Sequence, residues 1–163
     1  VVRAVNSVQA EPDSPTKHML EAFRFSSQGE AALIARINDH QTSLILVAEN
    51  LLHGDLVGVL TCQGYTWPSR QHVARLGILV VREWRGQGVG KQLMHKALGW
   101  AERHPTIRRL ELDIPADDDT AVAFYKWAGF LVAGRAKAAL WDGTTFHDTF
   151  YMARPVEKTL DAR

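Results

Sequence analysis

The sequence predicts an α/β (α+β) domain in which a mixed central sheet of about six to seven strands is flanked by helices. Two observations lead to this prediction. Between residues 72 and 114 an apolar strand, a helix and a second apolar strand follow one another, and such a crossover places its two strands parallel in one sheet. Apolar segments before and after this unit are joined by short turns, which predicts antiparallel hairpins. Together these patterns predict a mixed sheet with one parallel pair.

The length of the chain fits a single domain with a sizeable buried core. We expect residues 1–163 to form this one domain, with its core at about 1–155 and a tail at 156–163. The formal net charge is +1 and acids and bases are interspersed, so no nucleic-acid surface is expected. Apolar runs such as Ile78–Val81 and Leu44–Ala48 contain at most five residues and are too short to cross a bilayer.

The cysteine and histidine residues narrow the range of expected cofactors and cellular locations. The only cysteine, Cys62, lies in an apolar segment, which excludes an intramolecular disulfide framework and is compatible with a reducing cytoplasm. The seven histidines do not fall into a metal-ligand spacing. We therefore expect a cytoplasmic protein with no metal, no membrane partner and no nucleic-acid partner.

The elements in the first half follow from local patterns. Val1–Val5 is predicted to be a first strand, and helices are predicted at Thr16–Phe25 and Glu30–Ile37, where they would wall an acceptor pocket or serve as scaffold. Ser43–Glu49 and Leu56–Gln63 predict an antiparallel hairpin.

The next predicted strand is His72–Val80, within which Gly77 indicates a bulge or a close approach of ligand. The second half then alternates helices and strands. The predicted elements are, in order, a helix at Gly90–Arg103, a strand at Leu110–Ile114, a helix at Thr120–Ala128, and strands at Phe130–Ala139 and Thr145–Met152. The acids at 117–119 are expected to cap the second of these helices, and the turn at 141–144 predicts a hairpin between the last two strands.

The connection from the strand at 72–80 to the helix at 90–103 is rich in glycine. Gly86, Gly88 and Gly90 remove Cβ atoms at the start of a helix, where unpaired N–H groups and the positive end of the helix dipole attract anions. A Walker A loop is excluded because Gln92 stands where Ser or Thr is needed after Lys91. A dinucleotide fingerprint fits poorly because four residues separate the apolar run from the first glycine. The pattern predicts a site for another phosphate compound.

The pattern Arg85-x-x-Gly88-x-Gly90 resembles the acyl-CoA pyrophosphate signature of the GNAT superfamily of N-acetyltransferases. A second block resembles the same superfamily, with Asp118 in place of the usual Asn, then Ala121, Phe124-Tyr125 and Gly129-Phe130. From about residue 71 to 155 the chain looks most like small bacterial amino-acid N-acetyltransferases.

This resemblance implies a GNAT fold with the parallel strand pair at the acyl-CoA site, and acetyl-CoA as co-substrate. The residues it leads us to expect at that site are Leu79, Val80, Arg85, Gly86, Gln87, Gly88, Val89, Gly90, Lys91, Asp118 and Phe124.

Acetyl transfer from a thioester to an amine needs a proton donor for the departing thiolate and hydrogen-bond donors for the developing oxyanion. Tyr125 is our candidate acid, since a phenol with pKa near ~10 is protonated at neutral pH; the alternative is a core tyrosine whose hydroxyl finds a structural partner. The matching tyrosine of the family is the acid. A backbone N–H near Leu79 or Val80 is the expected oxyanion donor.

The attacking amine must also lose a proton. His72 is the first candidate base, because it shares a strand face with Ile78 and Val80 and imidazole is a common base at neutral pH. Glu111 or Asp113 acting through water, or an acceptor that binds already neutral, are the alternatives. Asp148 is expected to pair with a cationic acceptor, and a hydrogen bond within its strand is the other reading of that residue.

The sequence therefore predicts an enzyme that transfers acetyl from acetyl-CoA to a primary amine of a small molecule, such as an amino acid, by direct attack in a ternary complex. Acetylation of a protein N-terminus or lysine is a second reading. A non-enzymatic acyl-CoA sensor is a third. A homodimer is one option for the oligomeric state.

Overall fold

The computed structural model describes residues 31, 32, 34, 35 and 39–157 of the chain. The strand predicted at Val1–Val5 and the helix predicted at Thr16–Phe25 lie outside the described residues. Within the helix predicted at Glu30–Ile37, the described residues 31, 32, 34 and 35 are helical.

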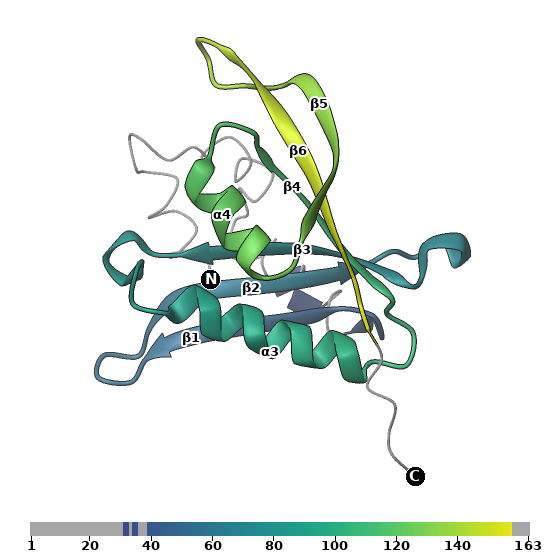
Figure 1. The fold of residues 1–163 in the computed structure, drawn as a ribbon. Helices are drawn as coiled ribbons and strands as arrows, with labels where there is room; N and C mark the ends of the chain where they lie inside the picture. Colours follow the sequence, from purple (N-terminus) through teal and green to yellow (C-terminus); the bar gives the residue numbers. More distant parts are fainter. Residues whose placement is uncertain (1–30, 33, 36–38, 158–163) are drawn as a thin grey trace.

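The described part of the chain contains one mixed sheet of six strands in the order β1-β2-β3-β4-β6-β5 (Figure 1). The bounds of the strands are β1 Leu44–Asn50, β2 Asp55–Gly64, β3 Val73–Val80, β4 Arg109–Pro115, β5 Leu131–Trp141 and β6 Phe146–Pro155. All six were predicted from the sequence to within two or three residues at each end. The predicted mixed sheet with one parallel pair is confirmed.

Strands β1, β2 and β3 form an antiparallel meander. β2 pairs with β3 in an unbroken register from Gly58 opposite Val80 to Gly64 opposite Ala74. Gly77 lies opposite Thr61 within this register, so the bulge suggested for Gly77 is not present. The regular pairing keeps Arg75, Gly77 and Leu79 on one face of the sheet, because side chains alternate along a strand.

The parallel pair β3–β4 is short and opens into a fork. Only three positions pair, from Val73 opposite Arg109 to Arg75 opposite Glu111. Beyond Glu111 the two strands diverge, and the opening lies at the end of β3 that leads into the connection with Gly86, Gly88 and Gly90, which we call the glycine turn (Figure 1). We call the diverging segments, 76–80 of β3 and 112–115 of β4, the fork.

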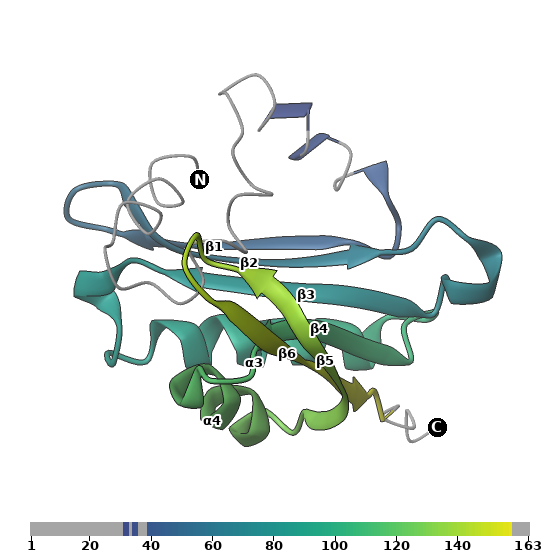
Figure 2. The ribbon, with the colours of Figure 1, turned by 90° about the horizontal axis from the view of Figure 1, so that it is seen from above.

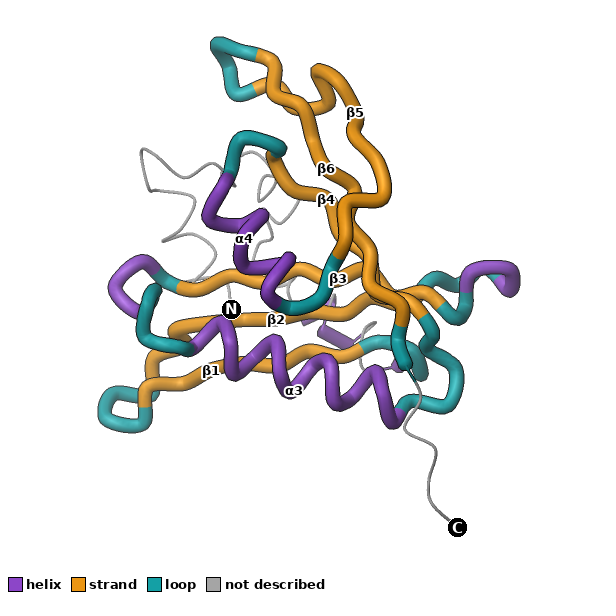
Figure 3. Tube along the Cα trace, viewed as in Figure 1, coloured by secondary structure: helices purple, strands orange, loops and turns teal. Residues whose placement is uncertain are grey.

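Two helices, α3 at Val89–Arg103 and α4 at Asp119–Trp127, lie on the same side of the sheet (Figures 2 and 3). Both match the predicted helices. Their apolar faces and the facing side chains of the strands form the core. Fully buried large side chains in this core are Leu60, Met94, Ile107, Leu110, Leu112, Phe130 and Met152. The 3-10 turns η2 at Pro68–Arg70 and η3 at Arg82–Trp84 flank β3.

The last strand, β6, lies between β4 and β5 and pairs antiparallel with both. The predicted hairpin between the last two strands is confirmed, but the position of β6 between β4 and β5 was not predicted. Packing continues beyond Pro155, where the predicted tail begins: Val156 is 9% exposed and its N–H donates to the Arg108 carbonyl at 2.9 Å. None of the described helices is long and apolar enough to cross a membrane.

Candidate active site

The glycine turn connects β3 to α3 in a conformation that its glycines make possible. Gly86 has φ 71° and Gly88 has φ 85°, values in the left-handed region that glycine adopts without strain. The turn is held by two side chains that fold back on it. Arg85 Nε donates to the Val80 carbonyl at 2.9 Å, and Gln87 Nε2 donates to the Glu83 carbonyl at 2.6 Å.

The backbone at the start of α3 offers donors to an anion. The first hydrogen bond of the helix runs from Gln92 N–H to the Gly88 carbonyl at 3.0 Å, so the N–H groups of the three preceding residues have no partner within the helix. The first turn carries no acidic side chain. Among the described residues, a Cβ built on Gly86 or Gly88 would meet no atom within 4 Å, so these atoms would project into open space. These features fit a bound pyrophosphate.

Helix α4 lies directly beside this turn. A Cβ on Gly90 would be 3.7 Å from the Phe124 ring and 3.7 Å from Val80 Cγ2. Lys91 Nζ lies 5.0 Å from the centre of the Trp127 ring. The structure therefore brings together Val80, Gly90 and Phe124, three residues that the sequence assigned to one site.

Within the described residues, the edge of β3 that faces β4 is free for backbone hydrogen bonding from residue 76 to residue 80. Leu79 and Val80 pair with Val59 and Gly58 of β2 on one side. On the other side no described strand pairs with residues 76–80, since the pairing with β4 ends at Arg75. Five extended residues span ~16 Å, and a free edge of this kind accepts an extended chain that carries amide groups.

Tyr125 lies on α4 with its ring in the core. The side chain is 6% exposed and packs edge-to-face on Phe124 and Phe130, with ring centres 5.4 Å and 5.7 Å away. Its hydroxyl makes no hydrogen bond to any other residue that the structure describes. Burial, aided by the nearby charge of Asp118, raises the pKa of Tyr125 above its ordinary value. The phenol therefore keeps its proton at neutral pH.

Asp118 ends the loop between β4 and α4 and caps the helix. Its Oδ1 accepts the Ala121 N–H at 2.9 Å, which confirms the predicted capping role of this acid. A cofactor contact of its second oxygen stays a prediction.

His72 lies just before β3, at the opposite end from the glycine turn. Its carbonyl accepts the N–H groups of Arg108 and Arg109 at 2.8 Å and 3.2 Å. Seven residues separate His72 from Leu79, which corresponds to ~23 Å along an extended strand. A general base must lie within hydrogen-bond reach of the proton that it removes. His72 precedes the first residue of β3, so the face that it was expected to share with Ile78 and Val80 stays a prediction, and the distance along the strand does not bring the imidazole to Leu79.

Glu111, one of the alternative bases, lies on the sheet face opposite the helices and is 2% exposed. Oε1 accepts from Tyr65 Oη at 2.7 Å and from Arg70 Nη2 at 2.5 Å, and Oε2 accepts from Tyr151 Oη. Burial opposes ionisation, but the hydrogen bonds from the two tyrosines and the charge of Arg70 outweigh it and hold the pKa of Glu111 below its usual value. Both carboxylate oxygens are occupied, so Glu111 is not available as a base.

Asp113 follows two residues later on the same face, inside the fork. Its Oδ2 lies 2.5 Å from Arg75 Nη2, and the two side chains are 29% and 49% exposed. Because Arg75 comes from β3 and Asp113 from β4, this ion pair joins the two strands where the fork begins. Sequence reasoning considered Asp113 but missed Arg75. The signal that finds it is the register, which places Arg75 opposite Glu111.

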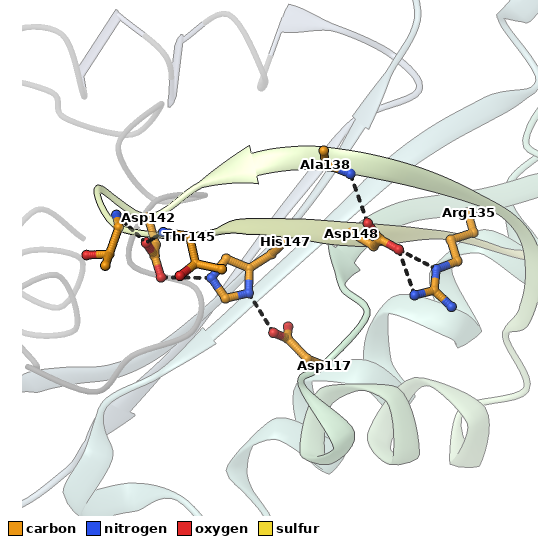
Figure 4. A network of polar contacts seen from close by, with 8 residues as sticks. Asp117, Arg135, Ala138, Asp142, Thr145, His147 and Asp148 are labelled. Carbon is orange, nitrogen blue, oxygen red and sulfur yellow. Dashed lines mark hydrogen bonds and ion pairs between the residues drawn. The ribbon is translucent and has the colours of Figure 1, made fainter.

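Asp148 lies on the other face of the sheet. It shares the face of Phe150 and Met152, which pack toward the helices. Its Oδ2 lies 2.6 Å from Arg135 Nη2, and its Oδ1 accepts the Ala138 N–H at 2.8 Å (Figure 4). The hydrogen bond within the strand pair that the sequence left as an alternative is therefore observed.

The described part of the chain contains no candidate metal site, because no group of three or more His, Cys, Asp or Glu side chains is arranged there to hold an ion. Cys62 is buried, and burial raises the pKa of its thiol to about 12. The thiol is therefore not a nucleophile at neutral pH.

A forked parallel pair whose longer arm runs through a glycine turn into a helix is the arrangement that the resemblance to N-acetyltransferases led us to expect. The sequence model of the Acetyltransferase (GNAT) family matches residues 9–130, and the chain belongs to this family. It is an acyl-CoA-dependent N-acetyltransferase.

Individual relatives agree with this assignment. The L-amino acid N-acetyltransferase AaaT of Escherichia coli (strain K12) is 28% identical over 160 residues, which cover 93% of this chain and 90% of that protein. Among solved structures, a phosphinothricin acetyltransferase from Sinorhizobium meliloti in complex with AcCoA superposes with a TM-score of 0.77 at 19% identity, covering 100% of this chain and 89% of that one. A GNAT acetyltransferase from Streptococcus pneumoniae gives 0.76 at 21% identity, covering 82% and 78%.

Proposed function

We propose that this enzyme transfers the acetyl group of acetyl-CoA to the primary amine of a small molecule, and that the molecule is an amino acid. The observation that carries the proposal is the fork, whose free β3 edge runs from the glycine turn to the charged pair of Arg75 and Asp113. The name of the Escherichia coli relative supports an amino acid as acceptor.

Binding of the co-substrate is assigned to the turn and to the free edge. The unpaired N–H groups from Val89 to Lys91, with the positive end of α3, bind the pyrophosphate. The edge of residues 76–80 offers backbone groups to the pantetheine arm. When bound, acetyl-CoA supplies an activated thioester. Phe124 and Val80 exclude water from the side of the turn that faces α4.

Proton transfer is assigned to two side chains. Tyr125 holds a proton for the departing thiolate, as its raised pKa and its hydroxyl without a described partner support. Asp113 receives the proton of the amine, directly or through one water, because it is the acidic side chain inside the fork whose oxygens are not saturated. A backbone N–H at Leu79 or Val80 stabilises the charge that develops on the carbonyl oxygen.

A thiol-release assay with acetyl-CoA tests the proposal. The acceptors are the twenty L-amino acids, simple primary amines and short peptides with a free N-terminus. We expect release with one or more amino acids, and an acetylated product by mass spectrometry. Absence of release with every acceptor would overturn the proposal, and release with peptides alone would replace it by protein N-terminal acetylation. A cytoplasmic location and a homodimer stay predictions.

A further inference from the structure

The ion pair between Arg75 and Asp113 lies where an acceptor would approach the fork. It is on the face opposite α3 and α4, and it is the point at which the two arms separate, because Arg75 belongs to the last paired position of β3. Both side chains are partly exposed, and each comes from a different strand. The pair therefore presents one positive and one negative group side by side at the base of the fork.

The neighbouring Glu111, on the same face of the sheet, is a structural carboxylate with which Asp113 can be compared. Glu111 is buried and receives hydrogen bonds on both oxygens from three side chains. Asp113 receives one ion-pair contact, on Oδ2, and remains accessible. Exposed ion pairs contribute little to stability, so exchanging this one for contacts with a ligand has a small cost.

The chain also leaves room beside the pair. Gly77 lies between Arg75 and Leu79 on the same strand face, and it has no side chain to cover the sheet there. Among the described residues, a Cβ at Gly77 would meet only Thr61 Oγ1, at 3.5 Å. The open position thus separates the charged pair from the backbone of Leu79 and Val80, where the acetyl group is to be placed.

We infer that Arg75 and Asp113 together recognise the zwitterion of an α-amino acid, with Arg75 binding the carboxylate and Asp113 the ammonium group. This inference rests on the proposed function and states which part of the substrate each residue binds. The ligand replaces the ion pair by two ion pairs of the same kind, so no charge is left without a partner. A guanidinium is well suited to the first contact because it binds a carboxylate through two parallel hydrogen bonds.

The assignment has a consequence for specificity. An amine without a carboxylate would take Asp113 from Arg75 and leave the guanidinium beside the Tyr65 hydroxyl, with which it shares a hydrogen bond, but without an anionic partner. A site built for a charged group discriminates against analogues that lack it, because the charged group on the protein then has no counter-ion. The enzyme should therefore prefer an amino acid to its α-amide.

The test compares Arg75→Gln with a matched control, Arg135→Gln, which also removes an exposed arginine paired with one aspartate, at 2.6 Å. The probes are the L-amino acid that the parent enzyme acetylates fastest and its α-amide. In Arg75→Gln we expect KM for the amino acid to rise roughly tenfold or more, as for loss of a hydrogen bond to a charged group. KM for the amide and Kd for acetyl-CoA should change less than about twofold, within the small effect of an exposed ion pair.

Two further measurements keep the result interpretable. Arg75→Lys retains the positive charge but lacks the planar guanidinium group. Its KM for the amino acid should lie between the values of the parent and of Arg75→Gln. Calorimetry with the amino acid, in the presence of CoA, should show the same order of affinities without turnover.

Equal losses for the amino acid and the amide in Arg75→Gln would overturn the inference, as would the same selective loss in Arg135→Gln. Acetylation of simple amines but of no amino acid by the parent enzyme would overturn this inference and the choice of an amino acid as acceptor, and would leave acetyl transfer to a small amine in place. Absence of acetylation of any amine would instead remove the proposed function on which it rests.

Discussion

The fork and the β5–β6 hairpin both carry polar side chains, but they differ in how far those groups are satisfied within the protein. At the candidate active site, which includes the fork, the N–H groups at the start of α3 lack helical partners, the Tyr125 hydroxyl has no described hydrogen-bond partner, and Asp113 holds a single, partly exposed ion pair. In the hairpin, His147 and Asp148 are each engaged by two partners.

The engaged groups of the hairpin are His147 and Asp148 (Figure 4). His147 Nδ1 lies 2.6 Å from Asp117 Oδ2, and Nε2 lies 2.8 Å from Asp142 Oδ2. These contacts tie the tip of the hairpin to the loop before α4. Asp148 joins Arg135 to the Ala138 backbone, and Ala138 is a non-glycine residue with φ 50°.

This difference distinguishes polar groups that stabilise the fold from polar groups that are positioned to bind a ligand. Buried or engaged groups with full hydrogen bonding stabilise the native state. Groups that the fold positions but does not satisfy are available to a substrate. Substitutions at the candidate active site should therefore change binding or turnover, whereas substitutions in the hairpin should change stability.

The largest effect is expected for Tyr125→Phe. The substitution removes the proton donor and keeps the ring that packs on Phe124 and Phe130, so kcat should fall by roughly 10²–10⁴-fold, the usual contribution of general acid catalysis. Acetyl-CoA affinity and melting temperature should stay close to those of the parent. Steady-state kinetics with calorimetry on the same preparation measure both. Turnover at the parent rate would make Tyr125 a core residue only.

A smaller effect, of a different kind, is expected for Asp148→Asn. The hydrogen bond from the Ala138 N–H and the ion pair with Arg135 hold the pKa of Asp148 below its usual value. The carboxylate thus stabilises the fold above the ordinary aspartate pKa of about 3.9, and this contribution is lost as pH falls through the lower folded value. At pH 7 the variant should melt at a lower temperature, with unchanged KM for acceptor and acetyl-CoA. A selective rise of the acceptor KM at unchanged stability would restore the acceptor-binding role predicted from the sequence.

The smallest effect concerns His147 and pH. Hydrogen bonds to Asp142 and then to Asp117 raise the pKa of His147, because only the protonated ring donates from both nitrogens. A raised folded pKa gives stability that is fully present below the unfolded value of about 6.5 and is lost as pH rises through the folded value. The difference in melting temperature between parent and His147→Gln should therefore shrink from pH 6 to pH 9. A difference independent of pH would show that the ring acts by packing. NMR titration of the ring gives the folded pKa independently.

The sequence predicted the strands and helices of the described region because their apolar periodicity and glycine or proline boundaries are local. It also predicted the glycine turn, since positive φ at Gly86 and Gly88 is encoded by residue type. It did not predict that β6 would lie between β4 and β5, because a hairpin specifies which strands pair but not which of them pairs with a third.

The polar residues of the site were harder to predict for the same reason. Glu111, Asp113 and Asp148 are all acidic residues in predicted strands. Only the register and the hydrogen-bond partners distinguish Glu111 and Asp148, which are engaged on both oxygens, from Asp113, which has one ion-pair contact. His72 precedes β3, and the length of that strand places it far from the glycine turn. Arg75 carried no sequence signal until the register placed it opposite Glu111.

The central claim, that the fork and its glycine turn bind the co-substrate, is tested most directly by acetyl-CoA calorimetry on two matched variants. Gly88→Val and Gly143→Val each place a branched residue at a glycine with positive φ, 85° and 97°, where a Cβ would meet no described atom within 4 Å. The backbone strain is therefore similar, roughly 1–2 kcal/mol in each. We expect both to melt at similarly reduced temperatures, with acetyl-CoA binding lost in Gly88→Val and retained in Gly143→Val. Parent-like affinity in a folded Gly88→Val protein would contradict the account.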